Sequence, residues 1–140
     1  MHMASKTRYL TVMDAIGLHA RMMMAMGMAP AALRDEGALE SALMRSQVAA
    51  HYERADLATQ AALLITGIAL AHPFVDGNKR TAFLCGVVFL QLNGLWLDVL
   101  GTEAGEELVA VLTRPGSVED ATARFAGWLR GHIRFAGDRR

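Results

Sequence analysis

The 140-residue sequence contains a single cysteine and no excess of charge of either sign. One cysteine excludes both an internal disulfide framework and a zinc site built from several thiolates. Cysteine usage of this kind is typical of a reducing compartment, so we expect a cytoplasmic protein. Lys and Arg together number 14, as do Asp and Glu, and the formal net charge is therefore zero. Such a chain lacks the positive field with which proteins bind nucleic acid or an anionic membrane surface.

Long hydrophobic runs are also absent. The uncharged stretches at 61–75 and 81–97 are interrupted by residues such as His72, Pro73 and Asn93, and both fall short of the ~20 apolar residues of a membrane span. They are interpreted as buried helices, and no membrane partner is expected. The N-terminus has no apolar core of signal-peptide length. Residues 1–8 are expected to be flexible, with Met1–Met3 interpreted as a cloning remnant.

Apolar residues make up 53% of the chain, which is too many for a disordered protein. A chain of this length forms one domain, and neither a repeat nor a linker divides it. We place this domain at residues 9–133 and expect a polar, frayed tail at 134–140.

Apolar periodicity predicts an all-α bundle of about six helices with no substantial sheet. Thr11, Asp56 and Ser117 are expected N-caps, and each of the three prolines lies at a predicted boundary. The predicted helices cover residues 12–26, 37–49, 57–71, 78–92 and 102–113 and a segment that begins at Ser117. A connection is expected at 48–57 and a short extended segment at 95–99. The helices at 57–71 and 78–92 are apolar nearly all round, which places them at the centre of the bundle.

Charge is nearly missing from residues 57–100, which contain only Asp76, Lys79, Arg80 and Asp98. Three of these four side chains lie within five positions, between the two most apolar helices. Charges in apolar surroundings destabilise a fold unless they are paired or used. We therefore look for function in the segment 72–82, HPFVDGNKRTA.

The residue types in this segment favour phosphate chemistry. Gly77 and Asn78 begin a helix whose first main-chain N–H groups are unpaired, and Lys79 and Arg80 add two cations there. Asp76 is a candidate ligand for Mg²⁺, which bridges protein carboxylates and nucleotide phosphates. Histidine is the side chain whose ordinary pKa is nearest to neutral, and His72 is therefore the candidate general base. Together they indicate group transfer from a nucleotide to a hydroxyl.

Each of these residues also has a purely structural interpretation. His72 could end its helix, Asp76 and Gly77 could form a turn, Asn78 could be a cap, and the two cations could be solvated. All of these interpretations would have to hold together between two uncharged helices, and this favours the functional one.

The segment 72–82 resembles the signature of the Fic/Doc family, His-x-Phe-x-Asp/Glu-Gly-Asn-Gly/Lys-Arg. Residues 34–43, and 9–11 leading into Leu18 and His19, resemble two further stretches of its death-on-curing branch, and the similarity extends over about 9–94. The resemblance implies an all-helical Fic fold and nucleotide-dependent modification of a protein hydroxyl. It assigns His72 as the base, Asp76 to Mg²⁺, and Gly77, Asn78, Lys79 and Arg80 to the phosphates of ATP. It also implies that 48–57 is a flap that aligns the target, and that Phe74 fixes the loop from the core.

Two departures indicate the branch. Fic adenylyltransferases have Gly at the position of Lys79 and a second Arg at the position of Phe83. The Lys-Arg-Thr-Ala form resembles Doc-type toxins, which implies a kinase that phosphorylates elongation factor Tu. No inhibitory Ser/Thr-x-x-x-Glu-Gly/Asn motif is well placed, which implies a separate, Phd-like antitoxin. An adenylyltransferase and a catalytically degenerate binding module remain as alternatives.

Several other residues are interpreted as structural. Cys85 is expected to be buried, and the two tryptophans, Trp96 and Trp128, are assigned to the core. His19 and His51 do not have metal-site spacing with His72. Glu36 and Glu40 could pair with Lys79 or Arg80, or could be solvated. The five methionines at 22–28 are interpreted as core, with a partner surface as the alternative.

Overall fold

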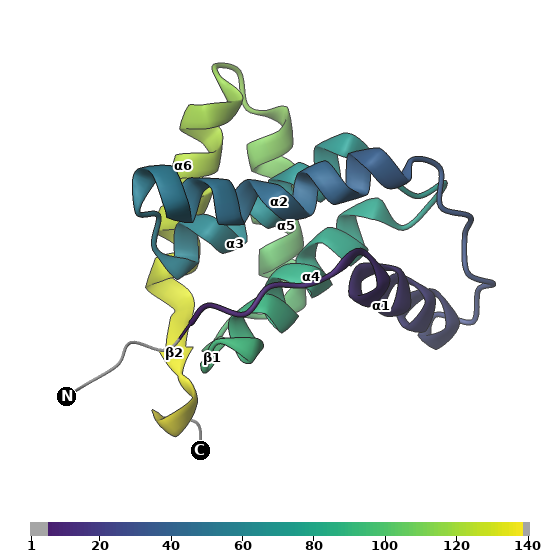
Figure 1. Cartoon of the computed structure of the whole chain (residues 1–140), viewed down its shortest axis with the longest axis horizontal. Helices are drawn as coiled ribbons and strands as arrows, with labels where there is room; N and C mark the ends of the chain where they lie inside the picture. The colour runs from purple at the N-terminus through teal and green to yellow at the C-terminus, as the bar shows by residue number, and fades with distance from the viewer. Residues whose placement is uncertain (1–5, 139–140) are drawn as a thin grey trace.

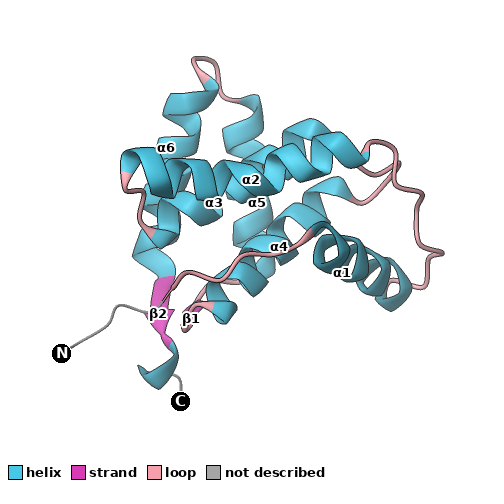
Figure 2. Cartoon of the chain, viewed as in Figure 1, coloured by secondary structure: helices cyan, strands magenta, loops and turns pink. Residues whose placement is uncertain are grey.

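A computed structural model describes residues 6–138, which form six α-helices and a two-stranded sheet (Figures 1 and 2). The helices are α1 (Val12–Ala25), α2 (Glu36–Glu53), α3 (Leu57–Ala71), α4 (Asn78–Leu92), α5 (Gly101–Thr113) and α6 (Val118–His132). The strands are β1 (Leu95–Leu97) and β2 (Ile133–Phe135), and a short 3-10 turn, Ala136–Asp138, follows. The all-α prediction is confirmed. The interpretation of Met1–Met3 falls outside the described residues, as do Arg139 and Arg140 of the expected tail.

Four helices begin at a side-chain cap, and three of these were predicted from the sequence. Thr11 accepts a hydrogen bond from the N–H of Asp14 at 3.1 Å, and the Asp14 carboxylate accepts one in return from the N–H of Thr11. Ser117 accepts in the same way from the N–H of Asp120. Such caps satisfy main-chain donors that have no partner within the helix, so they define where the helix begins.

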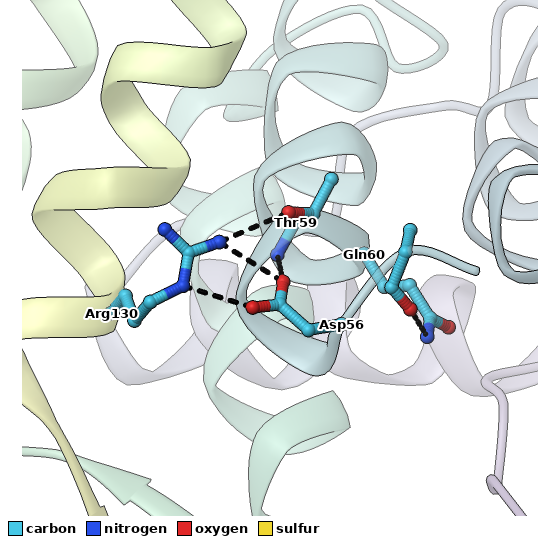
Figure 3. Close-up of polar contacts among 5 residues, drawn as sticks. Asp56, Thr59, Gln60 and Arg130 are labelled. Atoms are coloured by element: carbon cyan, nitrogen blue, oxygen red, sulfur yellow. Dashed lines mark hydrogen bonds and ion pairs between the residues drawn. The ribbon is translucent and has the colours of Figure 1, made fainter. Parts of the chain in front are cut away.

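The cap of α3 is tied to α6 (Figure 3). Asp56 accepts from the N–H of Thr59 at 2.9 Å, and its two carboxylate oxygens accept from Nε and Nη2 of Arg130. Nη2 of Arg130 also donates to the hydroxyl of Thr59. The hydrogen bond from Arg130 is the main reason that the pKa of the Asp56 carboxyl falls to about 2. Asp56, which was predicted as a cap from the local sequence, thus also joins α3 to α6, two helices that are distant in sequence.

α3 and α4 lie at the centre of the domain, as predicted. α3 packs against α2, α4 and α6, and most of its side chains are buried. The contact with α4 is close at Gly86, where an added Cβ would collide with Ile65 of α3. On its other side, Gly67 of α3 faces Ala42 and Arg45 of α2. Small residues at these crossings let the backbones approach each other. The loop between α3 and α4 therefore lies between two firmly packed helices.

The predicted connection at 48–57 was wrong. α2 continues to Glu53 and ends at Arg54, which adopts the left-handed conformation with φ 53°. The link to α3 is only residues 54–56, at the end of α3 opposite to His72. Fifteen helical residues separate these ends by roughly 22 Å. The flap inferred at 48–57 therefore does not lie beside the motif.

Residues 134–138 are also more regular than the frayed tail that was expected, since they continue β2 and form the 3-10 turn. β2 pairs antiparallel with β1, with Trp96 opposite Arg134 and Leu95 opposite Phe135. The indole N–H of Trp96 donates to the carbonyl oxygen of Phe135 at 3.2 Å. Arg134 forms an ion pair with Asp98 at 3.8 Å. Trp96 and Trp128 are both half-buried, so neither lies in the core, and Trp128 packs against its edge. In the described part of the chain, no helix has the length and hydropathy needed to cross a bilayer.

Candidate functional site

The segment 72–77 reverses the chain between α3 and α4 through two left-handed residues. His72 ends α3 with φ 49° and ψ 55°, and its N–H donates to the carbonyl oxygen of Ile68 at 3.2 Å. Gly77 precedes α4 with φ 79°. Pro73 disfavours the right-handed helical conformation at His72, so the helix ends there. The His72 side chain is exposed.

The Asn78 side chain holds this loop by two hydrogen bonds to its main chain. Its Oδ1 accepts from the N–H of Phe74 at 2.9 Å, and its Nδ2 donates to the carbonyl oxygen of Phe74 at 2.8 Å. Both residues are buried, and Phe74 is only 2% exposed. Because the Asn78 amide is committed to the backbone of Phe74, the main-chain N–H is the group of Asn78 that remains for a ligand.

Residues 32–35, which lead into α2, form a second support along the loop. The N–H groups of Arg34 and Asp35 donate to the carbonyl oxygen of Pro73 at 2.7 and 3.0 Å. The N–H of Val75 donates to the carbonyl oxygen of Ala32, and Leu33 pairs with Phe74 in an isolated bridge. The segment that lies along the motif by main-chain pairing is thus 32–35, and not the predicted 48–57. No periodicity distinguishes these residues in the sequence.

α1 provides a third support, through a residue that sequence reasoning set aside. His19 is 1% exposed, and its Nε2 lies 3.0 Å from the carbonyl oxygen of Asp76. Its ring stacks on Phe74 with centroids 3.8 Å apart and planes 3° from parallel. Metal-ligand spacing could not identify His19, because its ring contacts a carbonyl oxygen and an aromatic ring instead of other ligand side chains. Its position in the first family-like stretch was the available signal.

Gly77 is required by both backbone and space. Its φ lies in the region that side chains rarely adopt, and an added Cβ would lie 2.9 Å from both Met22 Cε and Met23 Sδ. Met22 and Met23 of α1 therefore pack directly against the motif at Gly77. Met23 is buried, whereas Met24 is 65% exposed and Met26 and Met28 are each 42% exposed. The assignment of these three exposed methionines to the core was wrong.

The start of α4 is electropositive. Gly77 makes no side-chain cap bond, and the first intrahelical bond runs from the N–H of Thr81 to the carbonyl oxygen of Gly77. The N–H groups of residues 78–80 therefore have no main-chain partner within the helix. Lys79 and Arg80 are exposed, and no ion pair joins either of them to a described residue. Backbone donors and two cations thus lie together at the start of α4, and this arrangement suits an anion.

Asp76 lies directly before this helix start. Its Oδ1 accepts from the N–H of Gly77 at 2.8 Å, while no donor among the described residues bonds to Oδ2. Within the described range, no three His, Cys, Asp or Glu side chains converge as metal ligands. One exposed carboxylate beside a helix start with free N–H groups fits the chemistry of Mg²⁺, which takes few protein ligands and can share oxygens with a phosphate.

Lys79 and Arg80 also border a groove of about 410 Å³ between α4 and α5. Its other walls are mainly apolar and are formed by Phe83, Leu84, Val87, Gly101, Gly105, Leu108 and Val109. Nη1 of Arg80 donates to Sδ of Met26, the residue that follows α1, at 3.0 Å, so this cation reaches from the groove to the end of that helix. His72 and Asp76 do not line the groove.

The remaining candidates do not join the site. Cys85 is fully buried, as expected, and this burial is the main reason that the pKa of its thiol rises to about 12. A thiol held neutral in this way is a poor nucleophile. Glu36 and Glu40 are exposed on α2, and neither forms an ion pair with a described residue. The solvated interpretation of these two glutamates holds.

The segment 72–82 lies within the part of the chain that matches a known protein family. A model of the Fic/DOC family matches residues 9–90. Toxin Doc of Mycolicibacterium smegmatis is 35% identical over 102 residues, which are 69% of this chain and 77% of that protein. Protein kinase doc of Escherichia phage P1 is 33% identical over 89 residues, which are 63% of this chain and 70% of that protein.

Proposed function

Since the chain belongs to the Fic/DOC family, we propose that it is a Doc-type toxin, a kinase that phosphorylates a protein hydroxyl in the cytoplasm. The observation that carries the proposal is the start of α4. There, the first N–H groups lack a main-chain partner in the helix, and two cations that form no ion pair with a described residue meet beside a carboxylate. Two relatives support the choice of branch, because one is named a toxin and the other a protein kinase.

In this proposal the residues of the α4 start bind the nucleotide. ATP supplies the phosphoryl group, and the N–H groups of Asn78, Lys79 and Arg80 bind its phosphates, together with the two cationic side chains. Gly77 keeps this approach free of a side chain. Mg²⁺ held by the Asp76 carboxylate would neutralise phosphate charge. The apolar groove beside Lys79 and Arg80 offers room for the rest of the nucleotide.

His72 acts as the general base. Its exposed imidazole accepts the proton of the target hydroxyl as the hydroxyl oxygen forms a bond to the γ-phosphorus. The bond from that phosphorus to its bridging oxygen breaks, and ADP leaves. Lys79 and Arg80 stabilise the charge that develops on the phosphoryl oxygens. The left-handed backbone of His72 sets the imidazole at the exposed end of α3.

Two residues favour phosphorylation over adenylylation. Lys79 stands where the adenylylating branch has Gly, and Phe83 stands where that branch has a second Arg. Phe83 lines the groove as a half-buried apolar ring and offers no charge for a phosphate. The phosphates are therefore expected to lie at Lys79 and Arg80 with the γ-phosphate toward the target.

The decisive experiment incubates the protein with Mg²⁺, ATP and purified elongation factor Tu and measures the intact mass of the factor. A phosphate adduct supports the kinase, and an AMP adduct supports the adenylyltransferase instead. Lys79→Ala is expected to reduce the rate because it removes one charge from the phosphate site. If Lys79→Ala retained full activity, the role given to Lys79 would be wrong.

Growth arrest tests the remaining alternative. Expression of the wild-type protein is expected to stop growth, and His72→Ala is expected to abolish the arrest. Arrest that persists with His72→Ala would support a catalytically degenerate binding module. A toxin of this kind needs a Phd-like antitoxin acting in trans, and co-expression of such an antitoxin should restore growth.

A further inference from the structure

We propose that His19 is a positioning residue that orients Asp76 for Mg²⁺–nucleotide binding. This inference rests on the proposed function, because it assigns a purpose to a contact with the proposed metal ligand. His19 is on α1, far in sequence from the motif, and its imidazole lies against the turn between Phe74 and Gly77.

The hydrogen bond to Asp76 has only one possible direction. A carbonyl oxygen accepts and cannot donate, so Nε2 of His19 bears the proton and donates to Asp76 at 3.0 Å. The imidazole is almost fully buried, and a buried polar atom without a partner would be strongly unfavourable. The bond therefore holds the main chain of Asp76 at a set distance from α1.

The ring itself has little freedom to turn. One face stacks on Phe74, whose backbone is bonded on both sides to the Asn78 amide. The Nε2 edge approaches Gly77, where an added Cβ would lie 3.5 Å away. His19 thus transmits the position of α1 to the loop through one directional bond and one stacking contact.

The consequence concerns the Asp76 carboxylate. The side chain is exposed, and its one hydrogen bond from a described residue comes from the N–H of Gly77 to Oδ1. Its direction therefore depends on the main chain of Asp76 and Gly77, which His19 holds. Groups that orient a metal ligand in this way commonly change metal affinity when they are removed.

Two substitutions separate the hydrogen bond from the stacking. His19→Phe retains a flat ring against Phe74 and loses the donor, whereas His19→Gln retains an amide donor and loses the ring. His51→Phe, on the exposed end of α2, is the control for a His-to-Phe change. If His19→Phe does not fold, His19→Asn replaces it, because its amide is too short to reach the carbonyl oxygen of Asp76.

The first measurement does not depend on activity. Hydrogen exchange at the amides of Phe74 and Val75, which donate to Oδ1 of Asn78 and to the carbonyl oxygen of Ala32, is expected to accelerate in His19→Phe. It is expected to stay near wild type in His19→Gln and His51→Phe. Unchanged exchange in His19→Phe would show that His19 does not hold the loop, and would overturn the proposal.

The second measurement is the Mg²⁺ concentration that half-saturates ADP binding. His19→Phe is expected to raise it about 10- to 100-fold, with metal-free ADP binding unchanged, while His19→Gln remains closer to wild type. Asp76→Asn is the reference and should remove the Mg²⁺ dependence. If Asp76→Asn changed the Mg²⁺ requirement and His19→Phe did not, the inference about His19 would be wrong, while the proposed metal role of Asp76 would stand. If Asp76→Asn left it unchanged, the proposed metal role of Asp76 would fail, and the inference with it.

Discussion

At the scale of single residues, His72 combines a proposed chemical role with an unfavourable backbone. Its φ of 49° costs an L-residue about 1 kcal/mol relative to glycine. We expect His72→Gly to be more stable to urea than His72→Ala by about 1 kcal/mol, although both lose the imidazole and are inactive. Equal unfolding free energies for the two variants would show that this conformation stores no strain.

Gly77 combines backbone and contact requirements, and a second glycine separates them. Gly94 has nearly the same φ, 80°, but an added Cβ there meets nothing within 4 Å. Gly94→Ala should therefore lose about 1 kcal/mol of unfolding free energy. Gly77→Ala should lose about 1–3 kcal/mol more, because its Cβ also displaces Met22 and Met23. Equal losses in thermal or urea unfolding would contradict the close packing of α1 on the motif.

At the scale of elements, the bidentate contact between Arg130 and Asp56 joins α6 to α3. The contact lowers the pKa of Asp56 to about 2, below its ordinary value, so it stabilises the fold above about pH 4. This contribution is lost as the pH falls through about 2. Both side chains are 53% exposed, so we expect Arg130→Ala to cost at most about 1 kcal/mol at neutral pH. The difference from wild type should vanish near pH 2.

The control for that substitution is Arg124→Ala. Arg124 is exposed on the same helix and forms no ion pair with a described residue. Its removal should leave the unfolding free energy nearly unchanged at every pH. A pH-independent loss in Arg130→Ala would indicate that Arg130 stabilises α6 by packing alone.

The crossing of α3 and α4 depends on the absence of a side chain at Gly86. We expect Gly86→Ala to lose about 1–3 kcal/mol because its Cβ collides with Ile65. Gly127→Ala, at an open and exposed position of α6, should instead gain about 0.5–1 kcal/mol. Adding Ile65→Val to Gly86→Ala removes a methyl group from the collision and should recover part of the loss. Additive effects in urea unfolding would contradict a direct contact.

At the scale of the whole molecule, the last residues close the domain against its middle and its start. β2 pairs with β1 (Figure 1). The N–H of Ala136 donates to the carbonyl oxygen of Gly94, and the Asn93 side chain bonds to the main chain of Arg8 in both directions. Deletion of residues 133–140 should lower the unfolding free energy by about 2 kcal/mol, because partly buried Ile133 is lost and Leu97 is exposed. Arg134→Ala keeps the strand and should change the unfolding free energy by less than about 0.5 kcal/mol. Equal losses would show that only the ion pair with Asp98 matters.

Features that depend on neighbouring residues could be predicted from the sequence. The caps at Thr11, Asp56 and Ser117 and the bounds of α3 and α4 were confirmed, since an N-cap bonds to a donor two or three residues away. The family signature in 72–82 was also local. The C-terminal end of α2 was not predicted. Residues 50–53 show no apolar periodicity that distinguishes a helix from a loop, so the predicted helix ended at residue 49.

The sequence by itself determined that the chain is a helical domain of the Fic/DOC family with its charged motif between two apolar helices. Only the tertiary structure decided what surrounds that motif: residues 32–35 along its backbone, His19 beneath Asp76, and methionines against Gly77. Apolar periodicity predicts that one face of a helix is buried, but it does not predict which residues that face contacts. Those partners depend on how α1 and α2 pack around the central pair, and packing is a property of the whole fold.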